Sequence, residues 1–404
     1  MTSLHNSVVV SDISLQFEPL PANAVPMAAH LHSVGYQTAV FTSNPWAGAI
    51  SGLERGTDLM RDGRAARDFT SSVELHEDYW AWREAYPAEP YWVHFQTTDV
   101  HEYEGTVPDP VPPFSGLYVT SGRRREFFEE WTRPEYADCR SGGFEAAGVD
   151  RVGFFETMRG LYDESLAHQD YQLGRLVERL RERGEWENTL LIVAADHGIN
   201  AALWDLGAFL RDSMPASWND PLLRSSTSRV PLIFVWPGRI EGGRRFDAPV
   251  SMIDVLPTVL DLLELPQPDI VQGQSLAPLL LGTPGWQPRP VILEEVSFNR
   301  RTGRSEGLIE MIDGRWGASL QLFNAESEPQ DRRPWPLLLY DVWADPWALT
   351  PVNERHPDLV EEYRTLLEAQ WVAHQALATR FTPGTEVTLT PEQLETLRSL
   401  GYIR

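Results

Sequence analysis

The sequence predicts an α/β fold with a mostly parallel central sheet flanked by helices, followed by a small C-terminal α+β subdomain. Over the first 300 residues, apolar runs of strand length alternate with segments of helical period, which is typical of a parallel sheet covered on both faces. After Gly307, short alternating segments indicate an antiparallel sheet and then a helix. We therefore expect a main domain at residues 1–300 and a C-terminal subdomain at residues 301–404.

The strands expected in the main domain are short apolar runs. They lie at residues 38–42, 91–97, 189–195, 230–236 and 291–295. In the C-terminal subdomain, strands are expected at residues 308–312, 316–323 and 337–342.

The clearest helical pattern covers residues 156–183, where apolar side chains recur at helical spacing and Gly184 supplies a C-terminal stop. Ser251 and Asp254 form a capping-box pattern that predicts the start of a second helix. Further helices are expected at residues 358–378 and from Thr390-Pro391.

Two segments show no such pattern. Residues 266–290 are rich in proline and glycine and indicate a surface loop. Residues 108–148 carry little strand or helix periodicity and are expected to form an insertion over the face of the sheet. Such an insertion is either a specificity loop or a loop without function.

Composition excludes several classes of function. The net charge of −24 disfavours binding to nucleic acids and to anionic membranes. All 34 basic residues are arginine, which excludes lysine nucleophiles and Schiff bases. Cys139 is the single cysteine, so an internal disulfide and a multi-cysteine zinc site are excluded. We find neither a signal-peptide pattern nor an apolar stretch of membrane-spanning length, and therefore expect a cytoplasmic protein.

One short motif points to metal chemistry. Asp196 and His197 follow the apolar run 190–195 and precede Gly198, at a strand end of the kind where open α/β sheets bind ligands. A carboxylate and an imidazole can bind a divalent cation, but Ca²⁺ takes about six to eight ligand atoms, so the pair is at most part of a site. By itself the motif is weak, and a strand end followed by a turn is the commoner explanation.

A series of elements in fixed order resembles the sulfatase family of the alkaline-phosphatase superfamily, over nearly the whole chain. The elements are Gly35-Tyr36-Gln37-Thr38-Ala39, Asp99-Val100-His101, Asp196-His197-Gly198, Arg229-Val230-Pro231, Asp254-Val255-Leu256-Pro257-Thr258, Gly273-Gln274-Ser275-Leu276, Leu339-Tyr340-Asp341 and Leu400-Gly401-Tyr402. This resemblance implies an alkaline-phosphatase-like sandwich.

In that family, two consecutive acidic residues near the N-terminus and a later Asp-His or Asp-Asn pair hold one divalent ion, usually Ca²⁺. The resemblance therefore implies that Asp196 and His197 are metal ligands, for Ca²⁺ or for another cation such as Mg²⁺ or Mn²⁺. It also implies that His101 donates a proton to the leaving alcohol or contacts a sulfate oxygen. A histidine in a strand-end loop is the alternative for His101.

The family's nucleophile is a cysteine or serine in a Cys/Ser-x-Pro-Ser-Arg element, oxidised to formylglycine. No such element occurs in the sequence, and neither Cys139 nor Ser213 fits it. In the family, this element and the paired acids precede the motif found here at Gly35-Tyr36. We therefore expect that the chain begins after them and that its main domain is N-terminally incomplete.

Two further departures concern sulfate binding. The family's sulfate-binding lysines have no counterpart, and Arg224 is the nearest cationic replacement, because arginine can hold a sulfate oxygen bidentately. Asn44 lies in Thr42-Ser43-Asn44-Pro45, where many relatives have Lys-x-His, and offers substrate only neutral hydrogen bonds. Surface pairing for Arg224 and turn formation for Asn44 are the alternatives.

Three functions stay open at this point. The first is hydrolysis of a sulfate monoester of a small molecule or carbohydrate, assisted by a divalent cation. The second is the same scaffold acting on a phosphate or phosphonate ester. The third is a catalytically inactive, truncated homologue that retains only binding.

Overall fold

The computed structural model describes residues 20–44, 47–48, 51–62, 72–87, 90–100, 113–136, 149–198, 228–299, 304–323, 336–382 and 391. The chain divides into two compact units. Unit 1 comprises residues 1–27, 190–198 and 219–386, and unit 2 comprises residues 28–189, 199–218 and 387–404.

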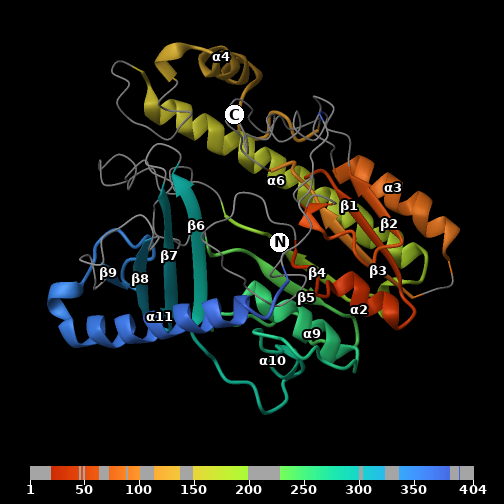
Figure 1. The fold of residues 1–404 in the computed structure, drawn as a ribbon. Helices are drawn as coiled ribbons and strands as arrows, with labels where there is room; N and C mark the ends of the chain where they lie inside the picture. Colours follow the sequence, from red (N-terminus) through yellow and green to blue (C-terminus); the bar gives the residue numbers. More distant parts are fainter. Residues whose placement is uncertain are drawn as a thin grey trace. The chain divides into compact units, whose positions relative to one another are not determined.

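Unit 2 contains a parallel sheet in the order β2-β1-β3, drawn in red and orange in Figure 1. Its strands are β1 (Gln37–Thr42), β2 (Leu59–Asp62) and β3 (Tyr91–Gln96). The central strand β1 is buried from Thr38 to Thr42. A continuous buried run is what a central parallel strand requires, because helices or loops cover both of its faces. The strands predicted at residues 38–42 and 91–97 are confirmed.

Aromatic packing attaches α3 (Ser72–Ala85) to this sheet. The ring of Tyr79 lies edge-on to Phe41 of β1 and to Phe95 of β3, with centroids 6.1 and 5.4 Å apart. Edge-to-face pairs are a favoured aromatic geometry. The N-terminal helix of this unit, α2 (Met27–Ser33), precedes β1.

The long helix α6 (Arg151–Glu182) confirms the strongest helical prediction and begins earlier than expected. The side chain of Asp150 caps it by accepting a hydrogen bond from the backbone N–H of Gly153 at 3.0 Å. At its other end Gly184 has a φ of +71°, a left-handed conformation that glycine adopts without strain.

The insertion contains a helix that the sequence did not predict. Thr120 caps α4 (Ser121–Trp131), and the helix packs Phe127 and Trp131 against Phe154 of α6, with centroids 4.7 and 5.9 Å apart. The low periodicity of residues 108–148 therefore gave no indication of the helix in this part. With only two buried side chains, α4 is too polar to show an apolar period.

Unit 1 contains the antiparallel pair β4 (Leu191–Ala194) and β5 (Leu232–Val235). The two strands lie where they were predicted, and they pair antiparallel within a fold predicted to be mostly parallel. An apolar run reports burial and carries no information about strand direction.

The predicted capping box of unit 1 is present. Ser251 and Asp254 form it at a 3-10 turn, Met252–Asp254, which leads into α9 (Val255–Leu262). The expected loop at residues 266–290 contains one short helix, α10 (Ala277–Leu281).

The C-terminal sheet is antiparallel, in the order β6-β7-β8-β9. Its strands are β6 (Val291–Asn299), β7 (Arg304–Asp313), β8 (Trp316–Phe323) and β9 (Leu337–Asp341). Helix α11 (Pro357–Ala378) packs across one face of it, through Tyr363, Leu367 and Trp371 (Figure 1). The strand predicted at residues 291–295 therefore belongs to this antiparallel sheet and not to the parallel one.

Two smaller observations complete the fold. The helix predicted from Thr390 lies outside the described residues except for Pro391, which is helical. Among the described helices, none has both the length and the apolar composition needed to cross a bilayer.

Candidate functional site

Polar residues gather where β1 and β3 end. The hydroxyl of Ser43 lies 2.9 Å from that of Thr98 and donates to the carbonyl of Gln96 at 3.1 Å. These contacts hold the segment after β1 against the segment after β3. Because parallel strands end at the same edge of a sheet, Asn44 and Asp99 are brought to one edge, the position that ligand sites of open α/β sheets occupy.

Asp99 anchors this edge. Both carboxylate oxygens accept the backbone N–H of Ser72 at 3.1 Å, so Asp99 satisfies a backbone donor at the first residue of α3. Nδ1 of His168, a buried side chain of α6, lies 3.8 Å from the carboxylate. Burial raises the pKa of Asp99, while the hydrogen bonds from Ser72 and the nearby His168 act in the opposite direction. Asp99 therefore ties β3, α3 and α6 together.

Asn44 is buried at the end of β1, with 5% of its surface exposed. Its backbone N–H donates to Oγ1 of Thr42 at 2.9 Å, and the Thr42 hydroxyl donates to the carbonyl of Asn44 at 2.8 Å. This reciprocal pair fixes the backbone at the point where the chain leaves the sheet. The turn-forming alternative for Asn44 thus has a structural basis, and the substrate contact stays a prediction.

In unit 1, Asp196 and His197 follow β4, and their side chains lie close to each other. Nε2 of His197 lies 4.0 Å from Oδ2 of Asp196. Nδ1 of His197 lies 2.7 Å from the carbonyl of Gly198, and the backbone N–H of His197 donates to Oδ1 of Asp196 at 3.1 Å. Both side chains reach the surface, with 52% of His197 and 27% of Asp196 exposed.

The contact of Nδ1 with the Gly198 carbonyl determines which ring nitrogen of His197 keeps its lone pair. An Nδ1–H that donates to the Gly198 carbonyl fixes the neutral tautomer whose lone pair is on Nε2, as is usual for metal-binding histidines. A carboxylate oxygen and an imidazole nitrogen are both donors to divalent cations, so the chemistry of the pair would fit part of a cation site. Within the described part of the chain, no cluster of three or more His, Cys, Asp or Glu residues is placed to hold a metal.

The remaining predicted positions cannot be placed. His101 and Arg224 lie outside the described residues, as do Cys139 and Ser213.

Sequence reasoning missed the two polar residues of α6 that organise unit 2. His168 approaches Asp99, and Glu164 accepts backbone hydrogen bonds from Gly116, Tyr118 and Val119 at 2.8–3.0 Å. The sequence did contain a signal for both residues. Glu164 and His168 follow buried Leu161 by three and seven positions, so they share its face of α6. A polar residue at an apolar position of a helix is a candidate for a buried hydrogen-bonding role.

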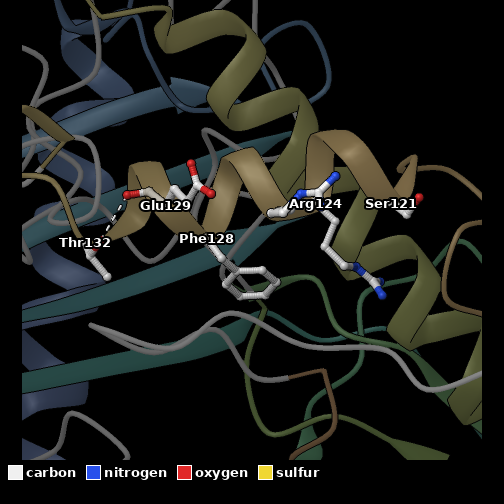
Figure 2. Close-up of a pocket in the computed structure, with 6 residues that line it drawn as sticks. Ser121, Arg124, Phe128, Glu129 and Thr132 are labelled. Atoms are coloured by element: carbon white, nitrogen blue, oxygen red, sulfur yellow. Dashed lines mark hydrogen bonds between the residues drawn. The ribbon is translucent and has the colours of Figure 1, made fainter.

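A groove of about 530 Å³ lies along α4, lined by Ser121, Arg124, Arg125, Phe128, Glu129 and Thr132 (Figure 2). The lining residues are spaced by three or four positions and so form one helix face. Nη2 of Arg124 pairs with the fully buried Glu164 at 2.7 Å. None of the predicted site residues lines this groove, so we do not assign the ester site to it.

Comparison with known proteins agrees with this architecture. The family model described as Sulfatase matches residues 2–265. The arylsulfatase K of Danio rerio is 33% identical over 214 residues, which are 52% of this chain and 37% of that protein. The ulvan-active sulfatase of Formosa agariphila is 24% identical over 278 residues, 65% of this chain and 50% of that protein. The chain thus spans at most half the length of these two curated relatives.

A solved structure supports the same fold. The phosphonate monoester hydrolase of Agrobacterium radiobacter superposes with a TM-score of 0.65 at 18% sequence identity, covering 92% of this chain and 85% of that one. Its strands and helices therefore share the alkaline-phosphatase-like arrangement predicted for this chain. Since the family model matches well over half of the sequence, the chain belongs to the sulfatase family.

Proposed function

We propose that this chain takes part in hydrolysis of sulfate monoesters, in which R–O–SO₃⁻ and water give R–OH, sulfate and a proton. Support comes from the family and from relatives that are named as sulfatases. The ester is that of a small molecule or a carbohydrate.

The observation that carries the proposal is the pair at the end of β4. Asp196 and His197 present an oxygen and a nitrogen 4.0 Å apart, and a backbone hydrogen bond fixes the histidine tautomer. These two side chains form part of the seat of a divalent cation, with Ca²⁺ as the first candidate and Mg²⁺ or Mn²⁺ as alternatives. A cation bound there supplies charge stabilisation to the sulfate oxygens as the S–O bond breaks.

Three further residues have proposed roles at the ester. His101 donates a proton to the leaving alcohol, Arg224 binds a sulfate oxygen through its guanidinium, and Asn44 donates a neutral hydrogen bond. The sequence contains no Cys/Ser-x-Pro-Ser-Arg element, so none of these residues replaces the family's formylglycine nucleophile.

Two alternatives share the scaffold. The solved neighbour is named as a phosphonate monoester hydrolase, and a phosphate or phosphonate ester presents similar oxygens to a cation and an arginine. A homologue that binds an ester without turning it over is the second alternative.

Cation binding tests the central claim. Isothermal titration of the whole chain with CaCl₂, MgCl₂ and MnCl₂ is compared between the native protein, Asp196→Asn and His197→Gln. We expect either substitution to weaken binding at least tenfold, because each removes one of the two neighbouring ligands. Asp247→Asn, at an exposed carboxylate elsewhere in unit 1, is the matched control and should leave binding unchanged. Equal affinity in all four proteins would refute the cation seat.

Hydrolysis then separates the three functions. The native chain is incubated with Ca²⁺ and either 4-nitrophenyl sulfate or 4-nitrophenyl phenylphosphonate, and nitrophenolate release is followed. Faster release from the sulfate supports the proposal. Faster release from the phosphonate supports the first alternative, hydrolysis of a phosphate or phosphonate ester. Cation binding without release from either ester indicates a protein that only binds.

A further inference from the structure

Helix α4 carries its charges in the order that its own dipole disfavours. Its N-terminal half contains Arg123, Arg124 and Arg125, and Glu129 and Glu130 lie near its end. The first turn has no acidic residue and the last turn has no basic one. Because the N-terminus is the positive end of a helix dipole and the C-terminus the negative end, this order of charges is unfavourable for an isolated helix.

Four of the six charged residues of α4 are paired within unit 2. Arg123 pairs with Glu130 at 2.8 Å and with Glu126 at 3.7 Å. Nη2 of Arg124 pairs with Glu164 of α6 at 2.7 Å. These contacts hold α4 against α6 and neutralise most of its charge.

The other two charged residues, Arg125 and Glu129, are exposed. Among the described residues, neither side chain has an ionic partner. They are four positions apart with the arginine nearer the N-terminus, which is the less favourable order for an ion pair within one helix. Both line the groove along α4, together with Phe128, a partly buried ring that follows Arg125 and precedes Glu129 in the sequence (Figure 2).

This groove face is complementary to a second copy of itself. Along it lie a positive group, an apolar ring and a negative group. If two such helices lie antiparallel about a two-fold axis at the level of Phe127, Arg125 of each copy is opposite Glu129 of the other. The positive end of each helix dipole then lies beside the negative end of the other, which compensates the unfavourable order of charges.

We propose that the groove face of α4 is a docking surface for a second copy of this chain, which binds through an antiparallel pair of α4 helices. Charge complementarity selects this occupant. A uniformly acidic partner would be repelled by Glu129 and a uniformly basic one by Arg125, whereas a second copy satisfies both. The inference concerns association of the chain and does not depend on the ester chemistry proposed above.

Sedimentation equilibrium of the full chain tests whether it associates. In about 0.15 M NaCl the screening length is about 8 Å, so repulsion between distant charges of two copies with net charge −24 is largely screened. A contact built on helices of 11 residues belongs with the weak interfaces below about 1,200 Å². We therefore expect the mass average to rise from 45.8 kDa towards twice that value over a concentration range of about 5–300 µM.

Two charge reversals test the surface itself. Arg125→Glu and Glu129→Arg each place like charges opposite one another at both symmetry-related contacts, so we expect either to weaken self-association at least about tenfold. Arg175→Glu is the matched control, because Arg175 is exposed on α6, does not line the groove, and its reversal changes the net charge as Arg125→Glu does. The control should associate as the native protein does.

A mixture of the two reversed proteins distinguishes docking from a folding defect. In an antiparallel pair, the two glutamates of Arg125→Glu are opposite the two arginines of Glu129→Arg. We therefore expect the 1:1 mixture to associate, while each protein alone remains monomeric. In a parallel pair the same positions would face their own equivalents, so the mixture also tests the direction of the helices.

Three results would overturn the docking surface. The first is a native protein that stays at 45.8 kDa over the whole concentration range. The second is a native dimer that Arg125→Glu weakens no more than Arg175→Glu does, because the copies would then meet through another surface. The third is a mixture of the reversed proteins that associates no more tightly than its components.

Discussion

At the scale of single residues, burial controls the charge of His76 on α3. Its ring lies edge-on to Phe95 of β3, with centroids 5.1 Å apart. Burial lowers the pKa of His76 from 6.5 to about 4, because a protonated imidazole loses its hydration in this position. His76 is therefore neutral at pH 7 and acts as a packing residue of the sheet.

This pKa shift predicts a pH dependence of stability. Between pH 4 and 6.5 the unfolded chain binds a proton at His76 and the folded chain does not, so the free energy of unfolding rises with pH. The contribution is complete above about pH 6.5 and is lost as the pH falls towards 4, with a slope of at most about 1.4 kcal/mol per pH unit. We expect His76→Phe to reduce this slope in urea-unfolding measurements. An NMR titration that places the pKa of His76 near 6.5 would contradict the explanation.

At the scale of elements, α6 organises unit 2 through one buried carboxylate. Glu164 accepts three backbone N–H groups from the segment before α4 and pairs with Arg124 of α4 at 2.7 Å. A buried carboxylate is costly unless its oxygens are satisfied, and here four donors satisfy them. The helix thus fixes both the path of this segment and the orientation of α4.

Removal of this carboxylate should release the segment. Glu164→Ala leaves three backbone N–H groups and the Arg124 guanidinium without their acceptor, so we expect destabilisation of about 3 kcal/mol. Hydrogen exchange at Gly116, Tyr118 and Val119 should accelerate more than exchange in β1. Glu126→Gln is the control, because that carboxylate is 67% exposed and its pair with Arg123 is on the surface. Unchanged protection of the three amides in Glu164→Ala would contradict this role.

At the scale of the whole molecule, the sequence predicted those elements whose signal is local. The capping box at Ser251 and Asp254 and the stop at Gly184 each depend on neighbouring residues, and both are confirmed. The direction of β4 relative to β5 and the sheet to which β6 belongs depend on distant pairing, which an apolar run in the sequence does not reveal.

The same distinction holds at the candidate site. Asp196 and His197 are adjacent in the chain, so the sequence could predict that they lie together after a strand. The contact between Asp99 and His168 joins residues 69 positions apart, and its only sequence signal is a histidine on the helix face that carries buried Leu161. Long-range polar contacts of this kind require the fold before they can be recognised.

The net charge of −24 is a property of the whole chain and predicts its response to salt. With 58 acidic and 34 basic residues, repulsion between like charges exceeds attraction between opposite charges and destabilises the folded state. The screening length falls from about 30 Å at 0.01 M salt to about 10 Å at 0.1 M. Buried pairs such as Arg83 with Glu185, 3.2 Å apart, are screened much less than the surface repulsion. We therefore expect the melting temperature to rise by a few degrees between 0.01 and 0.3 M NaCl in a thermal scan. An equal osmolality of sucrose controls for solute exclusion, and a melting temperature that falls with NaCl would show that attractive surface pairs outweigh the net charge.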